Sequence, residues 1–242
     1  MPSFARRGET LWYQRAGEGP PLILVHGWGA SAREWTEYGW ASLLAPVAQL
    51  LLPDVLGHGR SSKPHQVEAY ETEGLASDLL ALLDAARVDQ TDVFGYSMGG
   101  AIALRFAIRW PQRVRKLVIG APSGGEPEAA RSLGRALRTG DLRDERVRGY
   151  HEYALRSPGN DVLALAACLE TGLTAPPCNA LGQFQGSALV AAGDGDRRFE
   201  GSRGVAQCLP EATFLPLPGA DHMGAFGDAR LKDAVVAFLG AP

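Results

Sequence analysis

The pentapeptide Gly95-Tyr96-Ser97-Met98-Gly99 lies between two apolar runs and limits the possible folds more than any other feature of the chain. The run at 91–94 predicts a buried strand, and the run at 101–107 predicts a helix packed on a sheet. A G-x-S-x-G motif on a strand-to-helix turn presents its serine hydroxyl at the tip of the turn. We expect glycine to be needed at 95 and 99 because side chains there would clash with neighbouring backbone.

A serine hydroxyl is a poor nucleophile at neutral pH, so a catalytic serine needs a base and an acid that orients the base. Two later loops carry candidates. The loop after the apolar run at 188–192 contains Asp194 and Asp196, and the loop after the run at 213–217 contains His222. Both loops leave the carboxyl ends of expected strands, where parallel sheets place their sites. The residues alone leave both aspartates open as the acid.

Short apolar runs and amphipathic segments alternate along the chain, which predicts an α/β fold with a mostly parallel sheet flanked by helices. Strands are expected at 11–15, 22–25, 47–52, 91–94, 114–119, 188–192 and 213–217, and helices at 34–45, 72–86, 101–107 and 231–239. The alternation stops after residue 121, and the segment that follows is helical in character. We therefore expect a core at 1–121 and 183–242 with a helical cap at 122–182.

Composition excludes several classes of protein. The chain has 242 residues, 45% hydrophobic and 21% charged, which fits one large globular domain. A net charge of −3 suggests no nucleic-acid partner. The longest uncharged apolar stretch, 38–53, contains Pro46 and Gln49 and predicts no membrane span. No histidine pair lies at metal-binding spacing, so neither a metal nor a cofactor is expected.

The cysteines and the N-terminus bear on the compartment. No apolar segment follows Arg6 and Arg7, so we expect no signal peptide. Cys168, Cys178 and Cys208 fit no metal or redox spacing. An odd cysteine count without a secretion signal predicts reduced, mostly buried thiols in a cytoplasmic protein.

Five motifs together resemble the α/β-hydrolase superfamily, especially its small bacterial serine esterases. They are His26-Gly27-Trp28-Gly29, the D-x-x-G-H-G-x-S turn at 54–61, the 95–100 turn, Gly193-x-x-Asp196, and His222 after a short glycine turn. They span nearly the whole expected core. The resemblance implies a Ser-His-Asp triad, and its Gly-x-x-Asp spacing favours Asp196 over the aspartate two residues before it.

Carried over residue by residue, the resemblance implies that Ser97 is the nucleophile and His222 the general base and then acid. Asp196 would orient His222 and stabilise its charged form. The backbone N–H groups of Trp28 and Met98 would form the oxyanion hole, which stabilises the negative charge that develops on the substrate oxygen.

Substrate-binding candidates lie around this site and in the cap. The Trp28 ring and Met223 are expected to line the acyl pocket. Arg131, Arg135 and Arg138 fall on one side of a helix if that segment is helical, and they are interleaved with acidic residues. They form either a solvated face with ion pairs or, for Arg135 and Arg138 in particular, a docking surface for a carboxylate or an acidic carrier protein. The second interpretation is similar to esterases that cleave a pimeloyl methyl ester on acyl carrier protein.

The sequence therefore predicts a serine hydrolase, monomer or homodimer, that cleaves carboxylic esters of small to medium acyl chains through an acyl-enzyme. Its partner would be a small-molecule ester, free or linked to a carrier protein. One alternative keeps the triad but changes the reaction to C–C bond hydrolysis, acyl transfer or perhydrolysis. Another, of a different class, is a receptor-like protein that binds a ligand on a hydrolase scaffold.

Overall fold

The computed structural model of the chain describes residues 2–122 and 127–240. Within these residues one eight-stranded sheet has the strand order β1-β2-β4-β3-β5-β6-β7-β8. Neighbours from β4 to β8 pair in parallel, and β1 and β2 join one edge as antiparallel strands. The strands are β1 (Ser3–Arg6), β2 (Glu9–Ala16), β3 (Pro21–Val25), β4 (Gln49–Pro53), β5 (Thr91–Tyr96), β6 (Val114–Gly120), β7 (Ser187–Gly193) and β8 (Ala212–Leu217). The expected α/β fold with a mostly parallel sheet is confirmed.

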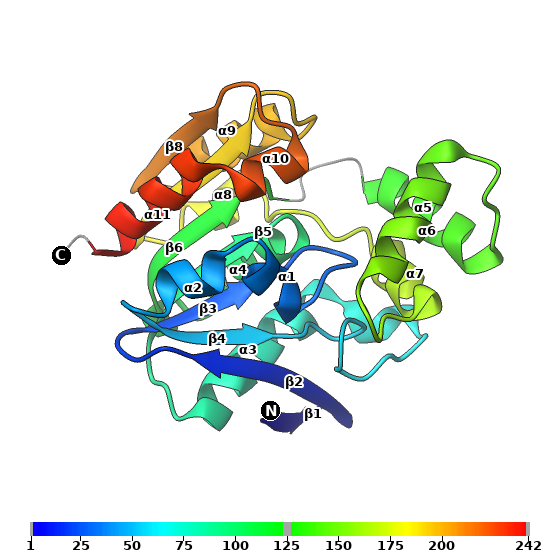
Figure 1. Cartoon of the computed structure of the whole chain (residues 1–242), viewed down its shortest axis with the longest axis horizontal. Coiled ribbons are helices and arrows are strands. Elements are labelled where there is room, and N and C mark those ends of the chain that lie inside the picture. Colours follow the sequence, from blue (N-terminus) through cyan, green and yellow to red (C-terminus); the bar gives the residue numbers. More distant parts are fainter. Residues whose placement is uncertain (1, 123–126, 241–242) are drawn as a thin grey trace.

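Helices cover both faces of this sheet (Figure 1). One face carries α3 (Thr72–Ala86), α4 (Met98–Arg109) and α9 (Phe199–Cys208). The other carries α1 (Ala32–Glu37), α2 (Trp40–Leu44), α10 (His222–Gly227) and α11 (Ala229–Gly240). Short 3-10 turns lie at Val67–Tyr70 and Pro111–Arg113. The sheet is therefore the middle layer of three.

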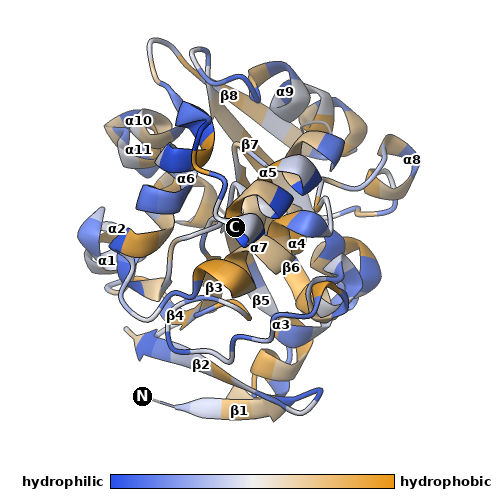
Figure 2. Cartoon of the chain, turned by 90° about the vertical axis from the view of Figure 1, so that its right-hand side faces the viewer, coloured by the Kyte–Doolittle hydropathy of each residue, from blue (hydrophilic) through white to orange (hydrophobic). Residues whose placement is uncertain are grey.

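The central strands are apolar on both sides because both of their faces are buried. In β3, Ile23 and Val25 point into the core beneath α3 and α4, whereas Leu22 and Leu24 point into the core beneath α1 and α2. All four side chains are fully buried or nearly so. Figure 2 shows hydrophobic residues along the inner strands and hydrophilic residues mainly on outer helices such as α6.

Between β6 and β7 the chain forms the helices α5 (Pro127–Thr139), α6 (Glu145–Arg156), α7 (Val162–Glu170) and α8 (Cys178–Leu181). The first three gather beyond the carboxyl ends of the strands (Figure 1). Gly134 lets α5 approach α7 closely, because a Cβ there would overlap the Ala166 carbonyl oxygen and Glu170. Of the expected cap at 122–182, residues 123–126 lie outside the described residues, and the boundaries of the cap stay a prediction.

Three local features differ from the expectation. The helix expected at 34–45 is divided into α1 and α2, because Gly39 adopts a positive φ of 78° that a continuous helix does not allow. The edge strand β1 and the helices α9 and α10 were not expected. The strand β1 alternates exposed and half-buried residues and contains no apolar run.

The expectation that all three thiols are reduced is wrong for two of them. Cys178 in α8 and Cys208 in α9 form a disulfide, with their Cα atoms 5.1 Å apart. They are 30 residues apart in sequence, so their spacing carries no sign of the pairing, which arises because α8 packs against α9. Cys168 is free and buried, as expected. The disulfide removes the cysteine argument for a cytoplasmic location, which stays a prediction.

Candidate active site

Ser97 occupies a strained turn between β5 and α4. Its φ of 55° and ψ of −115° are rare for a residue with a side chain, and its N–H donates to the Gly120 carbonyl at 2.8 Å. A Cβ at Gly95 would overlap the carbonyl of Gly99, and one at Gly99 would overlap the carbonyl of Val25. The expected need for glycine at both positions is confirmed. The turn leaves Ser97 9% exposed.

Asp196, rather than Asp194, contacts His222. The Asp196 Oδ2 lies 2.5 Å from His222 Nδ1. The other oxygen, Oδ1, accepts the Arg198 N–H at 3.0 Å and lies 3.6 Å from the Arg198 guanidinium. Asp194 instead accepts the N–H of Gly219 at 2.7 Å, which braces the loop after β8. The geometry therefore assigns the two aspartates different contacts.

Opposing effects act on the Asp196 carboxyl. Burial favours its neutral form, but the hydrogen bond and charge of His222, together with the Arg198 N–H and guanidinium, favour the carboxylate. The net result is a pKa below the ordinary value for aspartate. Asp196 is therefore ionised at neutral pH and can accept a hydrogen bond from the N–H at His222 Nδ1.

Tyr96, the residue before Ser97, binds the backbone of His222. The Tyr96 hydroxyl donates to the His222 carbonyl at 2.6 Å, and its ring packs 4.6 Å from that of Phe226. Asp221 caps α10 by accepting the Gly224 N–H at 2.7 Å. Strand β5 thus positions both Ser97 and the backbone of His222. Tyr96 lies inside the G-x-S-x-G motif, but the sequence contained no sign of this contact.

The Ser97 hydroxyl and His222 Nε2 do not form a hydrogen bond with each other among the described residues, although both belong to segments at the carboxyl edge of the sheet. Catalytic hydrogen bonds are often long or misaligned in unliganded enzymes and shorten when substrate binds. His222 Nδ1 contacts Asp196, and Nε2 remains available to bind the serine or a substrate.

The loop at 26–31, between β3 and α1, is anchored by His26. His26 is fully buried, donates from Nδ1 to the Gly27 carbonyl at 2.8 Å and accepts the Val55 N–H on Nε2 at 3.0 Å. Burial lowers its pKa, which keeps the ring in the neutral form that this hydrogen-bond pattern needs. Asp54 holds the end of the loop by accepting the N–H of Ala32, the first residue of α1, at 2.8 Å. His26 is therefore a structural residue of the loop.

This 26–31 loop lies beside the serine. A Cβ on Gly27 would be 3.5 Å from the Cβ of Ser97. The backbone N–H groups of Trp28 and Met98 donate no hydrogen bond to any residue that the structure describes. Two unpaired N–H groups, one on the loop and one at the start of α4, are thus available for an anionic oxygen next to the serine.

Residues of α6 and α7 contact the side chains of Trp28 and Met98. The Trp28 ring nitrogen donates to the Leu165 carbonyl in α7 at 3.0 Å, and the ring lies 5.3 Å from that of Tyr150 in α6. The Met98 sulfur lies 3.7 Å from that of Cys168 in α7. The side chains of Trp28 and Met98 therefore pack against α6 and α7.

The remaining substrate-binding candidates lie apart from these contacts. The exposed Arg135 pairs with Glu128 at 2.5 Å, and Arg138 pairs with Glu170 at 2.6 Å. The Arg135–Glu128 pair is exposed, as on a solvated face, whereas the Arg138–Glu170 pair is part-buried and Arg138 also donates to the His65 carbonyl at 3.3 Å. Met223 is half-buried and follows His222 in α10. A role of these three residues in substrate binding stays a prediction.

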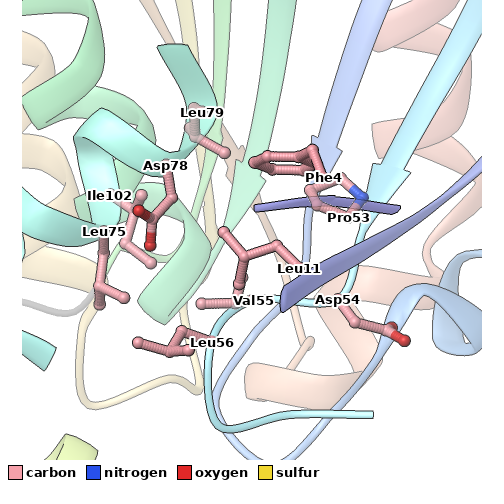
Figure 3. Close-up of a pocket in the computed structure, with 10 residues that line it drawn as sticks. All are labelled: Phe4, Leu11, Pro53, Asp54, Val55, Leu56, Leu75, Asp78, Leu79 and Ile102. Atoms are coloured by element: carbon pink, nitrogen blue, oxygen red, sulfur yellow. The ribbon is translucent and has the colours of Figure 1, made fainter. Parts of the chain in front are cut away.

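Two cavities lie away from the serine. One, of about 20 Å³, is surrounded by apolar side chains from β1, β2, α3 and α4, with Asp54 and Asp78 at its margin (Figure 3). The other is an open groove of about 510 Å³ between α5 and α6, with Leu133 and Val147 among its lining residues. Neither is lined by Ser97, Asp196 or His222.

Two features common to other classes of protein were not found. In the part of the chain that the structure describes, no cluster of three or more His, Cys, Asp or Glu side chains could hold a metal ion. None of the described helices has the length and apolar character needed to cross a membrane.

Comparison with known proteins decides the family. Residues 20–150, more than half of the chain, match the alpha/beta hydrolase fold family. The chain belongs to this family. The crystal structure of the enol-lactonase from Burkholderia xenovorans LB400 superposes with a TM-score of 0.85 over 99% of this chain and 100% of that one, at 23% identity. At that identity, the likeness shows the shared fold.

Several curated relatives are from Pseudomonas putida, and two of them illustrate the range of similarity. The chain is 38% identical over 106 residues to a 2-hydroxy-6-oxo-2,4-heptadienoate hydrolase of strain F1, which is 43% of this chain and 37% of that protein. It is 29% identical to a dihydrolipoyllysine-residue acetyltransferase component of an acetoin cleaving system, over 98% of this chain and 69% of that protein. The chain spans about a third to a half of the length of the first six curated relatives.

Proposed function

We propose that this alpha/beta hydrolase is a serine hydrolase that cleaves carboxylic esters of small to medium acyl chains. The observation that carries the proposal is the contact of Asp196 with His222 at the same sheet edge as the strained Ser97 turn. An oriented histidine at the same sheet edge as a serine on such a turn is typical of enzymes that carry out nucleophilic acyl transfer.

In the first step the Ser97 oxygen bonds to the ester carbonyl carbon and passes its proton to His222 Nε2. The carbonyl electron pair moves onto oxygen, which accepts hydrogen bonds from the N–H groups of Trp28 and Met98. The ionised Asp196 stabilises the charged imidazole. When the carbonyl re-forms, the alcohol leaves with the proton from His222. Water then repeats the sequence on the acyl-enzyme, releasing the acid and restoring Ser97.

C–C bond hydrolysis is the second candidate. It is favoured by the relatives named as hydrolases of 2-hydroxy-6-oxo-2,4-heptadienoate and of 2-hydroxymuconate semialdehyde, at 38% and 36% identity over part of the chain. Both reactions would use the same three side chains and differ in the leaving group, which is an alkoxide in ester hydrolysis and a stabilised carbanion in C–C hydrolysis; each takes its proton from His222. The substrate rather than the triad therefore separates them.

One panel of substrates tests both candidates. The protein and its Ser97→Ala variant are assayed with p-nitrophenyl acetate, butyrate and octanoate, an enol-lactone, and 2-hydroxy-6-oxo-2,4-heptadienoate. We expect turnover of the short esters, with losses of several orders of magnitude in the variant. Preferential turnover of the dienoate would replace the ester assignment with C–C hydrolysis. Tight binding of the panel compounds without turnover would instead support the receptor-like alternative.

A further inference from the structure

Asn160 lies in the turn between α6 and α7, and its side-chain amide joins three backbone segments. Its Nδ2 donates to the carbonyl oxygens of Gly29 at 2.7 Å and Ala154 at 3.0 Å. Its Oδ1 accepts the N–H of Gly59 at 2.9 Å. Gly29 belongs to the 26–31 loop and Ala154 to α6, whereas Gly59 belongs to the turn after β4. One cap side chain therefore bridges two core loops.

The chemistry of its partners requires an amide at this position. Gly59 supplies a donor, whereas Gly29 and Ala154 supply acceptors, so the orientation of the Asn160 amide is determined by its neighbours. A carboxylate could still accept from Gly59 but would face two carbonyl oxygens without a proton to donate. An alkyl side chain would satisfy none of the three groups.

The 26–31 loop is held from the core by His26 and Asp54, as described above. From the cap side it is held at Gly29, where Asn160 binds the carbonyl and the Tyr153 ring fills the space of a Cβ. Gly29 directly follows Trp28, whose unpaired N–H faces no described acceptor. The Gly29 carbonyl shares a peptide group with the Ala30 N–H, which donates to the Gly27 carbonyl at 3.2 Å, and that carbonyl shares a peptide group with the Trp28 N–H. A shift of the Gly29 carbonyl would therefore move the Trp28 N–H.

We propose that Asn160 is a positioning residue for the reaction: through the Gly29 carbonyl it holds the Trp28 N–H where an oxyanion forms. The inference rests on the proposed function. Loss of an oxyanion donor typically reduces turnover by about 10²- to 10³-fold, and displacement of a donor has a smaller effect. We therefore expect a fall in kcat of about tenfold or more when the amide is replaced, with little change in KM.

The test compares Asn160→Asp and Asn160→Ala with the control His65→Ala. His65 binds Asp161 at 3.0 Å, so it joins the core to the same cap turn without touching the 26–31 loop. For each variant, kcat and KM are measured with the best ester of the panel. Inhibition by an aryl trifluoromethyl ketone is measured as well. Ser97 would add to its carbonyl carbon, giving the proton to His222 and placing a negative charge on the ketone oxygen.

We expect both Asn160 variants to lose kcat and ketone affinity in parallel, whereas His65→Ala retains both. A role limited to stability would lower the melting temperature and leave kcat and ketone affinity at the wild-type values in the folded protein. That result, or an equal loss in His65→Ala, overturns the inference while the proposed function stands. Equal ester turnover by wild type and Ser97→Ala overturns the proposed function and the inference with it.

Discussion

At the scale of single residues, the proposed chemistry depends on which aspartate meets His222. Asp194 and Asp196 share one loop, yet the first braces the backbone at Gly219 and the second contacts the imidazole. An orienting carboxylate selects the histidine tautomer whose Nε2 is free to accept the serine proton. Two carboxylates that lie two residues apart in sequence therefore have different expected effects on turnover.

We predict that Asp196→Asn lowers kcat by about 10³- to 10⁴-fold, because an amide can present its N–H to His222 Nδ1 and hold the wrong tautomer. Asp194→Asn is the matched control: its amide oxygen can still accept the Gly219 N–H, so kcat should stay within about threefold of wild type. Steady-state ester hydrolysis measures both. A larger loss in the Asp194 variant would transfer the role of the acid to that residue.

A second residue-scale prediction concerns Glu34 in α1. Burial raises its pKa above the ordinary 4.5, only partly opposed by the hydrogen bond from Tyr153. A raised folded-state pKa means that the folded chain binds more protons than the unfolded chain. The Glu34 contribution therefore lowers the free energy of unfolding as pH rises from about 4.5 through the folded-state pKa, and is constant above it.

Glu34→Gln removes this titration while preserving the shape of the side chain. We expect wild type to lose free energy of unfolding relative to the variant as pH rises from about 4 to about 7, measured by urea unfolding at each pH. The hydrogen bond from Tyr153 lowers the pKa of Glu34, so its loss in Tyr153→Phe should raise that pKa further. The decline in the free energy of unfolding should then continue to higher pH. A wild-type-to-variant difference that is the same at every pH would contradict the assignment.

At the scale of elements, long-range contacts of single side chains and a disulfide join the helices between β6 and β7 to the rest of the fold. The hydrogen bonds of Asn160 to Gly29 and Gly59 link residues 131 and 101 positions apart. The disulfide links α8, at the end of the cap segment, to α9, which begins just after Asp196. The disulfide therefore also restrains the segment that follows Asp196, the residue proposed as the acid.

We predict that loss of the disulfide destabilises the fold. Closing a loop of about 30 residues removes chain entropy from the unfolded state worth about 3–4 kcal/mol. Cys178→Ser should lower the free energy of unfolding by up to that amount, measured by urea unfolding without reductant. Dithiothreitol should bring wild type to the level of the variant and leave the variant unchanged. If wild type were insensitive to the reductant, the covalent link would make no such contribution.

At the scale of the whole molecule, the sheet could be predicted because each central strand is a short apolar run that is buried on both sides. The helix expected at 72–86 has the bounds of α3. The strand β1 could not be predicted, because an edge strand needs no apolar run. The division of the helix at 34–45 depends on the positive φ of Gly39. Glycine adopts both positive and negative φ, so its presence in the sequence does not tell whether a helix continues through it.

The site was predictable in part for the same reason. Ser97, His222 and Asp196 follow strands that could be recognised, so their place at one sheet edge followed from the parallel topology. The Gly-x-x-Asp spacing of the family resemblance already favours Asp196, but the disulfide and the bridge made by Asn160 depend on contacts across the fold. No local pattern in the sequence encodes these two features, because each partner is chosen by packing of elements that are far apart along the chain.

The most direct test of the proposed function is covalent labelling of the nucleophile. The protein is treated with a fluorophosphonate, which reacts with activated serines, and the modified peptide is identified by mass spectrometry. We predict one adduct per chain, on Ser97, and a loss of labelling of several orders of magnitude in His222→Ala because the base is absent. An adduct on another residue, no adduct in the folded wild-type protein, or undiminished labelling of Ser97 in His222→Ala would contradict the account.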